Sequence, residues 1–570
     1  HHALPDAQES RGLGDVYKRQ LLLLSSSSML HSIEKADLII SSNKVILMTG
    51  HQKAQPLSIA VQNKKIVWIG SHTEAKKIQG QRINYHNQAI LPGFIDAHGH
   101  ASYLAFATQV ANIASPPVGE VKTIKDLQEN LKKFIKDSNL QPGEWVMGLG
   151  YDDSLLAEQR HPTKDDLDAV STDHPIYLIH VSAHLGAANS MGLSLANINS
   201  ESNDPPGGKI RRYENSLEPN GVFEETAAYP LQQLAMSAYK DPIGSVKKAM
   251  DIYARNGITT AQDGASSQET IALMQAADAQ GMINLDIISY PIGQNGLDQN
   301  LDSINFGNYK GRLKIGGIKL ILDGSPQGKT AYLTEPYYKP PHRELNSYKG
   351  YPLIPQSEVS KWVKRYADLN IPIMAHANGD AAADMLIEAV KNADITSDHR
   401  TIMIHAQTVR EDQLDKMKEL SIIPSYFSTH TFYWGDWHRD SVFGEDRAMR
   451  ISPTKSTLNR KIPFTVHNDA PVVPPDMIRL LWSTTNRKTR SGKVLGEEQK
   501  ISTYSALEAM TINAAFQHFE DDIKGSIEVG KLADLVVLSE DPLSIPVNEL
   551  LKLKIMATYS HGKEIFKNEK

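Results

Sequence analysis

"LPGFIDAHGH", residues 91–100, ends an apolar run with two histidines that stand two positions apart. Side chains alternate between the two faces of an extended strand, so His98 and His100 would share a face with Phe94 and Asp96. Two explanations are open at this point. The histidines are either ordinary polar residues at a strand end or half of a metal site whose other ligands lie elsewhere in the chain.

Seven further runs are also candidates for buried core strands. Most of the eight runs are followed by a segment with helical periodicity, such as "DAAADMLIEAVKNA". Eight strand–helix units predict an α/β fold, the TIM (β/α)8 barrel, with its chemistry at the carboxyl ends of the strands. The eight predicted strands lie within 93–100, 257–264, 283–292, 314–324, 371–380, 401–407, 422–428 and 462–472.

Both ends of the chain carry short strands separated by turns. Short strands at both ends predict a small composite β-sandwich built from residues 29–92 and 515–570, with the barrel between them at 93–514. The first two barrel strands are too far apart for a simple connection, so we expect an inserted subdomain at about 101–250. Residues 1–28 lack apolar periodicity and are interpreted as a disordered or non-native leader.

Composition excludes several classes of protein. The chain of 570 residues has a net charge of −6, so nothing suggests nucleic-acid binding, and it has no cysteine (Cys 0). Disulfides, thiolate ligands and a cysteine nucleophile are therefore excluded, and a metal would need His, Asp, Glu or Lys-derived ligands. Because no apolar stretch of about 20 residues is present, we expect no membrane span. No convincing signal peptide is visible, and we expect a cytoplasmic location.

Polar residues at the same end of other predicted strands extend the pattern begun by the two histidines. By strand alternation Lys319 points into the barrel, where an ammonium is costly unless it is paired or neutralised. Each residue alone has an ordinary explanation, such as a packed histidine, a salt-bridged lysine or a helix-capping aspartate. Their convergence on one end of the barrel predicts a metal site. The candidate ligands are His98, His100, Lys319, His376, His405 and Asp469.

The order of motifs resembles the amidohydrolase superfamily, and most strongly its amidohydrolase 3 branch, which includes N-substituted formamide deformylases. The resemblance covers nearly the whole chain from about Ala36. It implies a metal-dependent hydrolase barrel with a β-sandwich formed by both chain ends. The motifs that carry it are "LPGFIDAHGH", "PTKDDLDAV", "NGVFEETA", "NGITTAQDG", "KLILDGSPQGKTA", "HANGDAAAD", "IHAQTV", "HNDAPV" and "GSIEVGKLADLVVL".

The resemblance also implies a division of the ligands between one or two divalent metals per chain. His98, His100 and Asp469 would bind one metal, and His376 and His405 would bind a second. Zinc suits imidazole and carboxylate ligands, while manganese and iron stay open. Members of this branch differ in whether both metals are present.

Lys319, carboxylated by CO₂, would bridge the two metals in this scheme. Asp469 would also take a proton from the attacking metal-activated hydroxide and pass it to the leaving nitrogen. The branch varies in whether the modified lysine occurs, so the role of Lys319 is the one most open to test.

Four residues are predicted to contact the substrate. His467, in the "HNDAP" motif, either contacts substrate or only packs beside Asp469. Trp434 and Trp437, in "STHTFYWGDWHRD", would line an aromatic or alkyl pocket or would pack within their own loop. His184, in "VSAHLGAANS", would reach the mouth of the site through the insertion, or would be structural.

These observations predict a metal-dependent amidohydrolase acting on a small-molecule substrate that contains a non-peptide C–N bond, as in an amide, formamide or cyclic amide. One alternative is an ester or lactone hydrolase with the same site. Another is a non-catalytic regulatory protein that keeps the fold. No nucleic-acid or membrane partner is expected, and a homo-oligomer is left open.

Overall fold

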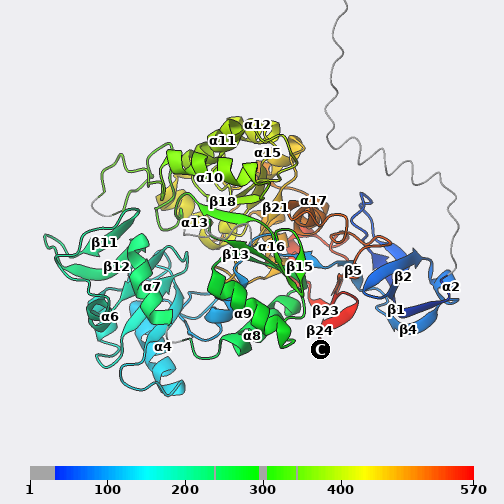
Figure 1. Ribbon diagram of the computed structural model, residues 1–570, viewed down its shortest axis with the longest axis horizontal. Helices are drawn as coiled ribbons and strands as arrows, with labels where there is room; N and C mark the ends of the chain where they lie inside the picture. The colour runs from blue at the N-terminus through cyan, green and yellow to red at the C-terminus, as the bar shows by residue number, and fades with distance from the viewer. Residues whose placement is uncertain (1–32, 237–238, 294–303, 342–343, 570) are drawn as a thin grey trace, which may run out of the picture.

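The computed structural model describes residues 33–236, 239–293, 304–341 and 344–569 (Figure 1). A sheet made from both chain ends lies at one side of a central α/β body, and an inserted α/β subdomain lies at the other side. The predicted leader at 1–28 lies outside the described residues, so its interpretation stays a prediction.

Each of the eight predicted barrel runs contains a strand of the central body. These strands are β6 (Phe94–Ile95), β13 (Ile258–Ser266), β14 (Asp286–Pro291), β17 (Ile318–Ile321), β18 (Ile373–Ala377), β19 (Ile402–His405), β20 (Ile423–Tyr426) and β21 (Thr465–Val466). They pair in parallel in the orders β6-β13-β14 and β17-β18-β19-β20-β21.

Short links join these two groups of strands. A parallel bridge pairs Ile292, just beyond β14, with Lys319 of β17. Beyond the other ends of the two groups, the Asp469 amide donates to the His98 carbonyl at 3.1 Å. The links bring the residues that follow β6 and β21 together, although they are far apart in the sequence.

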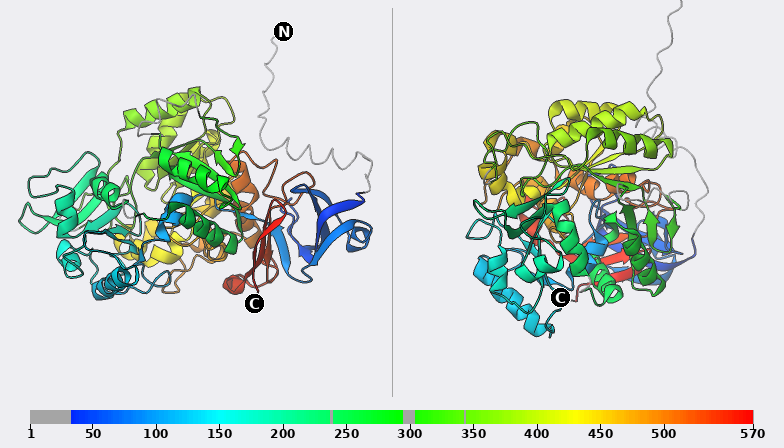
Figure 2. Two further views of the ribbon diagram at one scale, coloured as in Figure 1. Left: turned by 60° about the horizontal axis from the view of Figure 1, so that its bottom comes forward. Right: turned by 60° about the vertical axis from the view of Figure 1, so that its left-hand side comes forward.

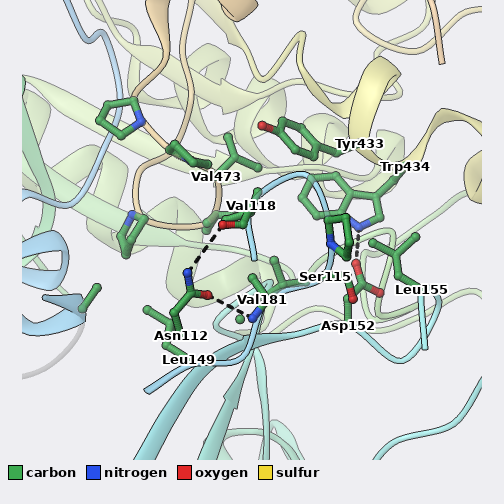
Figure 3. A pocket seen from close by; sticks show the side chains of 18 of the residues that line it. Asn112, Ser115, Val118, Leu149, Asp152, Leu155, Val181, Tyr433, Trp434 and Val473 are labelled. Carbon is green, nitrogen blue, oxygen red and sulfur yellow. Dashed lines mark hydrogen bonds between the residues drawn. The ribbon is translucent and has the colours of Figure 1, made fainter. Parts of the chain in front are cut away.

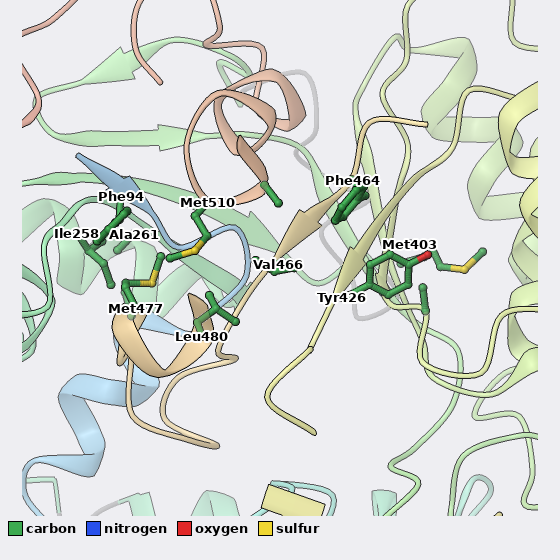
Figure 4. Packing of buried hydrophobic residues seen from close by; sticks show 14 of the residues in the cluster. Phe94, Ile258, Ala261, Met403, Tyr426, Phe464, Val466, Met477, Leu480 and Met510 are labelled. Carbon is green, nitrogen blue, oxygen red and sulfur yellow. The ribbon is translucent and has the colours of Figure 1, made fainter. Parts of the chain in front are cut away.

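Apolar packing around the strands holds their ends in place. Every residue of β18 is buried, as expected for a short run covered on both faces. Figure 4 shows Phe94 of β6 and Ile258 of β13 near Met477 and Met510, which come from helices α16 (Met477–Asn486) and α17 (Thr503–Met510). Burial of each large apolar side chain contributes on the order of 1.5–3 kcal/mol. This core therefore fixes the strand ends that carry the candidate ligands.

The two chain ends meet in one eight-stranded sheet. Its order is β24-β23-β22-β5-β1-β2-β3, with β4 paired to β1. The strands are β1 (Lys35–Val45), β2 (Gln55–Gln62), β3 (Lys65–Gly70), β4 (Gln79–Asn84), β5 (Ala89–Pro92), β22 (Leu535–Leu538), β23 (Ile555–Ser560) and β24 (Lys563–Lys567). Antiparallel pairing of β22 with β5 joins the N-terminal and C-terminal strands, which lie side by side in Figure 2. The division of this sheet into a sandwich stays a prediction.

The insertion contains a six-stranded sheet with the order β11-β12-β10-β9-β8-β7. Its strands are β7 (Ala111–Asn112), β8 (Val146–Tyr151), β9 (Ile176–His180), β10 (Leu185–Ala188), β11 (Gly208–Arg212) and β12 (Pro219–Glu225). Helix α8 (Pro242–Arg255) packs instead on α3 (Ala101–Ala107) and on β13 of the central body. The predicted boundary at about 250 thus falls inside a helix that covers the barrel strands.

Among the described residues, no helix combines the length and the apolar character that crossing a membrane requires.

Candidate metal centre

One cavity of about 340 Å³ gathers the residues that follow the barrel strands. Its walls include all six candidate ligands, which lie in β17, β18 and β19 or in the segments that follow β6 and β21. The ligands in the wall are His98, His100, Lys319, His376, His405 and Asp469. The structure therefore brings together residues that the sequence placed at the same ends of different strands.

The Asp469 carboxylate lies among the imidazoles. Its Oδ1 is 3.0 Å from His100 Nε2 and 3.4 Å from His98 Nε2, and its Oδ2 is 3.8 Å from His405 Nε2. His405 and Asp469 have φ values of 71° and 59°, a left-handed conformation that costs a residue other than glycine on the order of 1–3 kcal/mol. Such strain is frequent at functional sites, and here it occurs at two members of the candidate ligand set.

This donor set fits a divalent metal. His98, His405 and Asp469 each offer one ligand atom, and these atoms lie within 4.8 Å of one another. Within the described part of the chain, the buried Oδ1 of Asp469 makes no hydrogen bond of good geometry, as expected of an oxygen arranged for a cation. Burial lowers the pKa of His98 and of His405 well below the ordinary value, which favours the neutral imidazole that binds metals.

Lys319 is 2 % exposed, and its Nζ lies 3.4 Å from His98 Nε2. Burial lowers the pKa of Lys319 to about 7, although the Asp469 carboxylate opposes this shift. A substantial share of the side chain is therefore the neutral amine near neutral pH. The structure thus gives the inward orientation that strand alternation predicted, in an environment that disfavours a free ammonium.

Hydrogen bonds occupy both nitrogens of His376. Nδ1 lies 3.0 Å from Asp323 Oδ1, and Nε2 lies 3.3 Å from the amide nitrogen of Asn378. Its ring packs against that of His405, with 4.6 Å between the ring centroids. Binding a second metal through His376 would require one of these hydrogen bonds to be exchanged for a bond to the metal.

Two residues outside the predicted set orient the imidazoles. Gln262 Oε1 lies 2.5 Å from His98 Nδ1, while its amide nitrogen donates to the Ala97 carbonyl. Asp323 is fully buried, and it accepts from the backbone as well as from His376. Such partners fix the ring and the tautomer of a ligand. The polar residues within the buried runs "TTAQDG" and "LILDG" were the sequence signal for these roles.

Replacing Gln262 by methionine is expected to weaken metal binding about 10- to 100-fold, because His98 would lose the partner that orients its ring. Competition with a chromogenic chelator measures this change. Gln517→Met is the matched control, since Gln517 donates to the same Ala97 carbonyl at 2.7 Å without contacting a candidate ligand. Equal metal affinities of the two variants would contradict the role of Gln262 in orienting His98.

Comparison with known proteins identifies the family of this chain. The model of the amidohydrolase family, in its amidohydrolase 3 form, matches residues 81–566. The chain belongs to this amidohydrolase family. The family resemblance inferred from the motifs is thereby confirmed, and with it a hydrolase with a metal site.

Three known proteins match this chain almost end to end. The chain is 27 % identical to an N-substituted formamide deformylase of Arthrobacter pascens, over 92 % of this chain and 97 % of that protein. It is 25 % identical to the protein LONG AFTER FAR-RED 3 of Arabidopsis thaliana, over 93 % and 92 % of the two chains. It is 24 % identical to the putative amidohydrolase YtcJ of Bacillus subtilis, over 89 % and 96 %.

Solved structures support the fold. An uncharacterized metal-dependent hydrolase from Pyrococcus horikoshii superposes with a TM-score of 0.70 and 22 % identity, covering 90 % of this chain and 98 % of the other. A similar hydrolase from Pyrococcus furiosus gives a TM-score of 0.67 and 24 % identity, covering 90 % and 99 %. The family and these neighbours give the chain the α/β TIM-barrel fold of metal-dependent hydrolases.

The rest of the amidohydrolase cavity is largely apolar. Its wall beyond the ligands includes Phe106, Tyr229, Met236, Leu273 and Leu353. His184, for which the sequence left a position at the mouth of the site or a structural role open, lines the cavity. It lies beside a second residue of the insertion, Glu225, which was absent from the predicted site residues. The motif "NGVFEETA" contained Glu225, but nothing in its spacing marked this residue as a partner of His184.

The structure places the other predicted substrate contacts away from this cavity. Trp434 donates through Nε1 to Asp152 at 2.6 Å and lines a separate cavity of about 250 Å³, drawn in Figure 3. Trp437 donates to the Gln327 carbonyl at 3.1 Å and lines a third cavity. Both belong to helix α13 (His430–Trp437), where each indole N–H takes a partner in the surrounding protein, as buried indoles usually do.

His467 lies behind the candidate ligands. It is fully buried, with Nε2 at 3.2 Å from His405 Nδ1 and Nδ1 at 2.9 Å from the Ser425 hydroxyl. It is absent from the lining of the metal cavity. Of the two alternatives predicted for His467, this position favours packing and orientation of His405 over contact with substrate.

Proposed function

We propose that the chain is a metal-dependent amidohydrolase that cleaves a non-peptide C–N bond in a small amide, formamide or cyclic amide with an apolar substituent. The observation that carries the proposal is the convergence of six candidate ligands on one cavity whose remaining wall is largely aromatic and aliphatic. The likeness to an N-substituted formamide deformylase supports formamides within this class.

Zinc suits a site with several imidazoles and a carboxylate. His98, His100 and Asp469 would hold the first ion. His405, assigned to the second ion from the motifs, would join the first, because its ligand atom lies within 4.8 Å of those of His98 and Asp469. Lys319, as a carbamate, would bridge to a second ion held by His376. Once bound, a divalent metal supplies a Lewis acid that lowers the pKa of water and polarises a carbonyl group.

Asp469 is the residue proposed to move the proton. Burial opposes ionisation of this carboxyl, but the neighbouring His100 lowers its pKa below the ordinary value, so the carboxylate is ready to accept a proton at neutral pH. Hydrolysis forms a C–O bond to the attacking water and breaks the C–N bond. Asp469 takes the proton that the water releases and gives it to the departing nitrogen.

Removing the metal is expected to abolish hydrolysis reversibly. Protein purified without chelator should contain at least one transition metal ion per chain by elemental analysis. Dialysis against a chelator should remove both the metal and the activity in a screen of formamides, hydantoins, N-acyl amino acids and lactones, and added Zn²⁺ or Mn²⁺ should restore them. Protein without stoichiometric metal would contradict the proposal, and hydrolysis confined to lactones would reassign the bond that is cleaved.

A further inference from the structure

The inserted subdomain brings an imidazole–carboxylate pair to the wall of the metal cavity. His184, just before β10, directs Nδ1 to Oε2 of Glu225 at the end of β12, at a distance of 2.7 Å. Both residues line the cavity, and the His184 ring lies 5.1 Å from the His376 ring, measured between centroids. The pair therefore lies beside the candidate ligands, although neither residue belongs to that set.

The carboxylate of this pair is held rigidly. Glu225 has φ 49° and ψ −124°, a conformation that is strained for a residue with a side chain. Its amide donates to the His184 carbonyl at 2.7 Å, so backbone and side chain both join the two residues. On the barrel side, a Cβ atom at Gly324 would lie only 2.3 Å from Glu225 Oε1, so the loop after β17 packs closely against the same carboxylate. The fold therefore fixes Glu225 from two sides.

The contact with Glu225 leaves the other imidazole nitrogen for the cavity. Hydrogen bonding at one ring nitrogen determines which atom a histidine presents elsewhere. Within the described part of the chain, His184 Nε2 makes no hydrogen bond, whereas Nδ1 is occupied by Glu225. The ring thus presents Nε2 to whatever occupies the space beside His376.

Amide hydrolysis needs protein or metal partners for three groups: the carbonyl oxygen of the amide, the attacking water and the leaving nitrogen. A metal held by the candidate ligands would serve the carbonyl oxygen, and Asp469 would accept the proton from the water. We infer that His184 is a further catalytic residue, whose Nε2 makes a hydrogen bond with the leaving nitrogen, and that Glu225 is its positioning residue. This inference rests on the proposed function.

The chemical balance leaves no proton on His184. The C–O bond to the water oxygen forms, the C–N bond breaks, and the proton taken from water by Asp469 ends on the nitrogen. The hydrogen bond to His184 keeps that nitrogen in place while the proton arrives. Its contribution is largest for an amide, because the amide N–H can donate to Nε2, whereas the alkoxy oxygen of an ester carries no hydrogen to donate.

The test compares N-butylformamide with its oxygen analogue, butyl formate. His184→Phe keeps an aromatic ring and removes Nε2, and is expected to lower kcat for the formamide about 10²-fold, with less than a tenfold loss for the ester. The amide-to-ester ratio is kcat for the formamide divided by kcat for the ester. Glu225→Leu should lower this ratio as His184→Phe does. Glu225→Gln, which keeps an acceptor for Nδ1, should have most of the wild-type ratio. KM for both compounds should change far less than kcat for the formamide.

His180→Phe is the matched control, because His180 forms another buried imidazole–carboxylate pair in the same sheet, 3.0 Å from Asp153 and outside the metal cavity. It should leave the amide-to-ester ratio unchanged. An unchanged ratio in His184→Phe, or loss of bound metal in both the His184 and Glu225 variants, would overturn the inference while leaving the proposed function intact. Absence of hydrolysis of any C–N compound by the metal-loaded wild type would overturn both.

Discussion

Asp469→Asn is expected to lower kcat by about 10²- to 10⁴-fold, because the side chain keeps its size but loses the charge that accepts a proton. The carboxylate lies within 3.0 Å of His100 and 3.4 Å of His98, among the candidate ligands. The same exchange also removes a charged ligand, so bound metal is to be measured in the sample used for kinetics. If the variant still holds metal but has lost turnover, the loss of activity is due to the loss of proton transfer.

Asp476→Asn is the matched control for this experiment. Asp476 follows the same strand, but its carboxylate caps helix α16 by accepting from the Arg479 amide at 2.9 Å, outside the metal cavity. This control should change kcat by less than about twofold, since cap and surface substitutions act mainly on stability. Wild-type kcat in Asp469→Asn would place the proton transfer on another residue.

Lys319→Ala is expected to lose a second metal ion more readily than the first and to lose most activity with it. The neutral amine of Lys319, favoured because burial lowers its pKa to about 7, can attack CO₂, form an N–C bond and release one proton. The resulting carbamate is an anion that two dications would stabilise. Alanine cannot form it, whereas His98, His405 and Asp469 remain for the first ion.

Chemical rescue separates a carbamate from a structural lysine. Formate or acetate should partly restore metal content and kcat in Lys319→Ala, and bicarbonate should help only the wild type. Lys319→Arg keeps a cation that cannot be carboxylated, so it should resemble the alanine variant without responding to carboxylates. Two ions and full activity in Lys319→Ala would show that Lys319 is no ligand and that the histidines and Asp469 hold both ions without it.

The sequence by itself determined the strands and the residues at their ends. Alternation within β17 places every second side chain on one face, so the parity of Lys319 was sufficient to direct it inward. His98 and His100 lie in the bent segment that follows β6, so for them the sequence predicted the location and the local chain path gave the direction. Because parallel strands end at one side of a barrel, residues after five strands had to meet there. The cavity that holds His376, His405 and Asp469 follows from these two local rules.

Tertiary structure alone decided the partners of those residues. His98 meets Gln262 and His184 meets Glu225 across pairs of strands whose relative register no local pattern specifies. Trp434 and Trp437 follow a barrel strand, yet the rotation of helix α13 turns their indoles to Asp152 and Gln327. Periodicity within one element fixes the face of a side chain, whereas its hydrogen-bond partner depends on how separate elements pack.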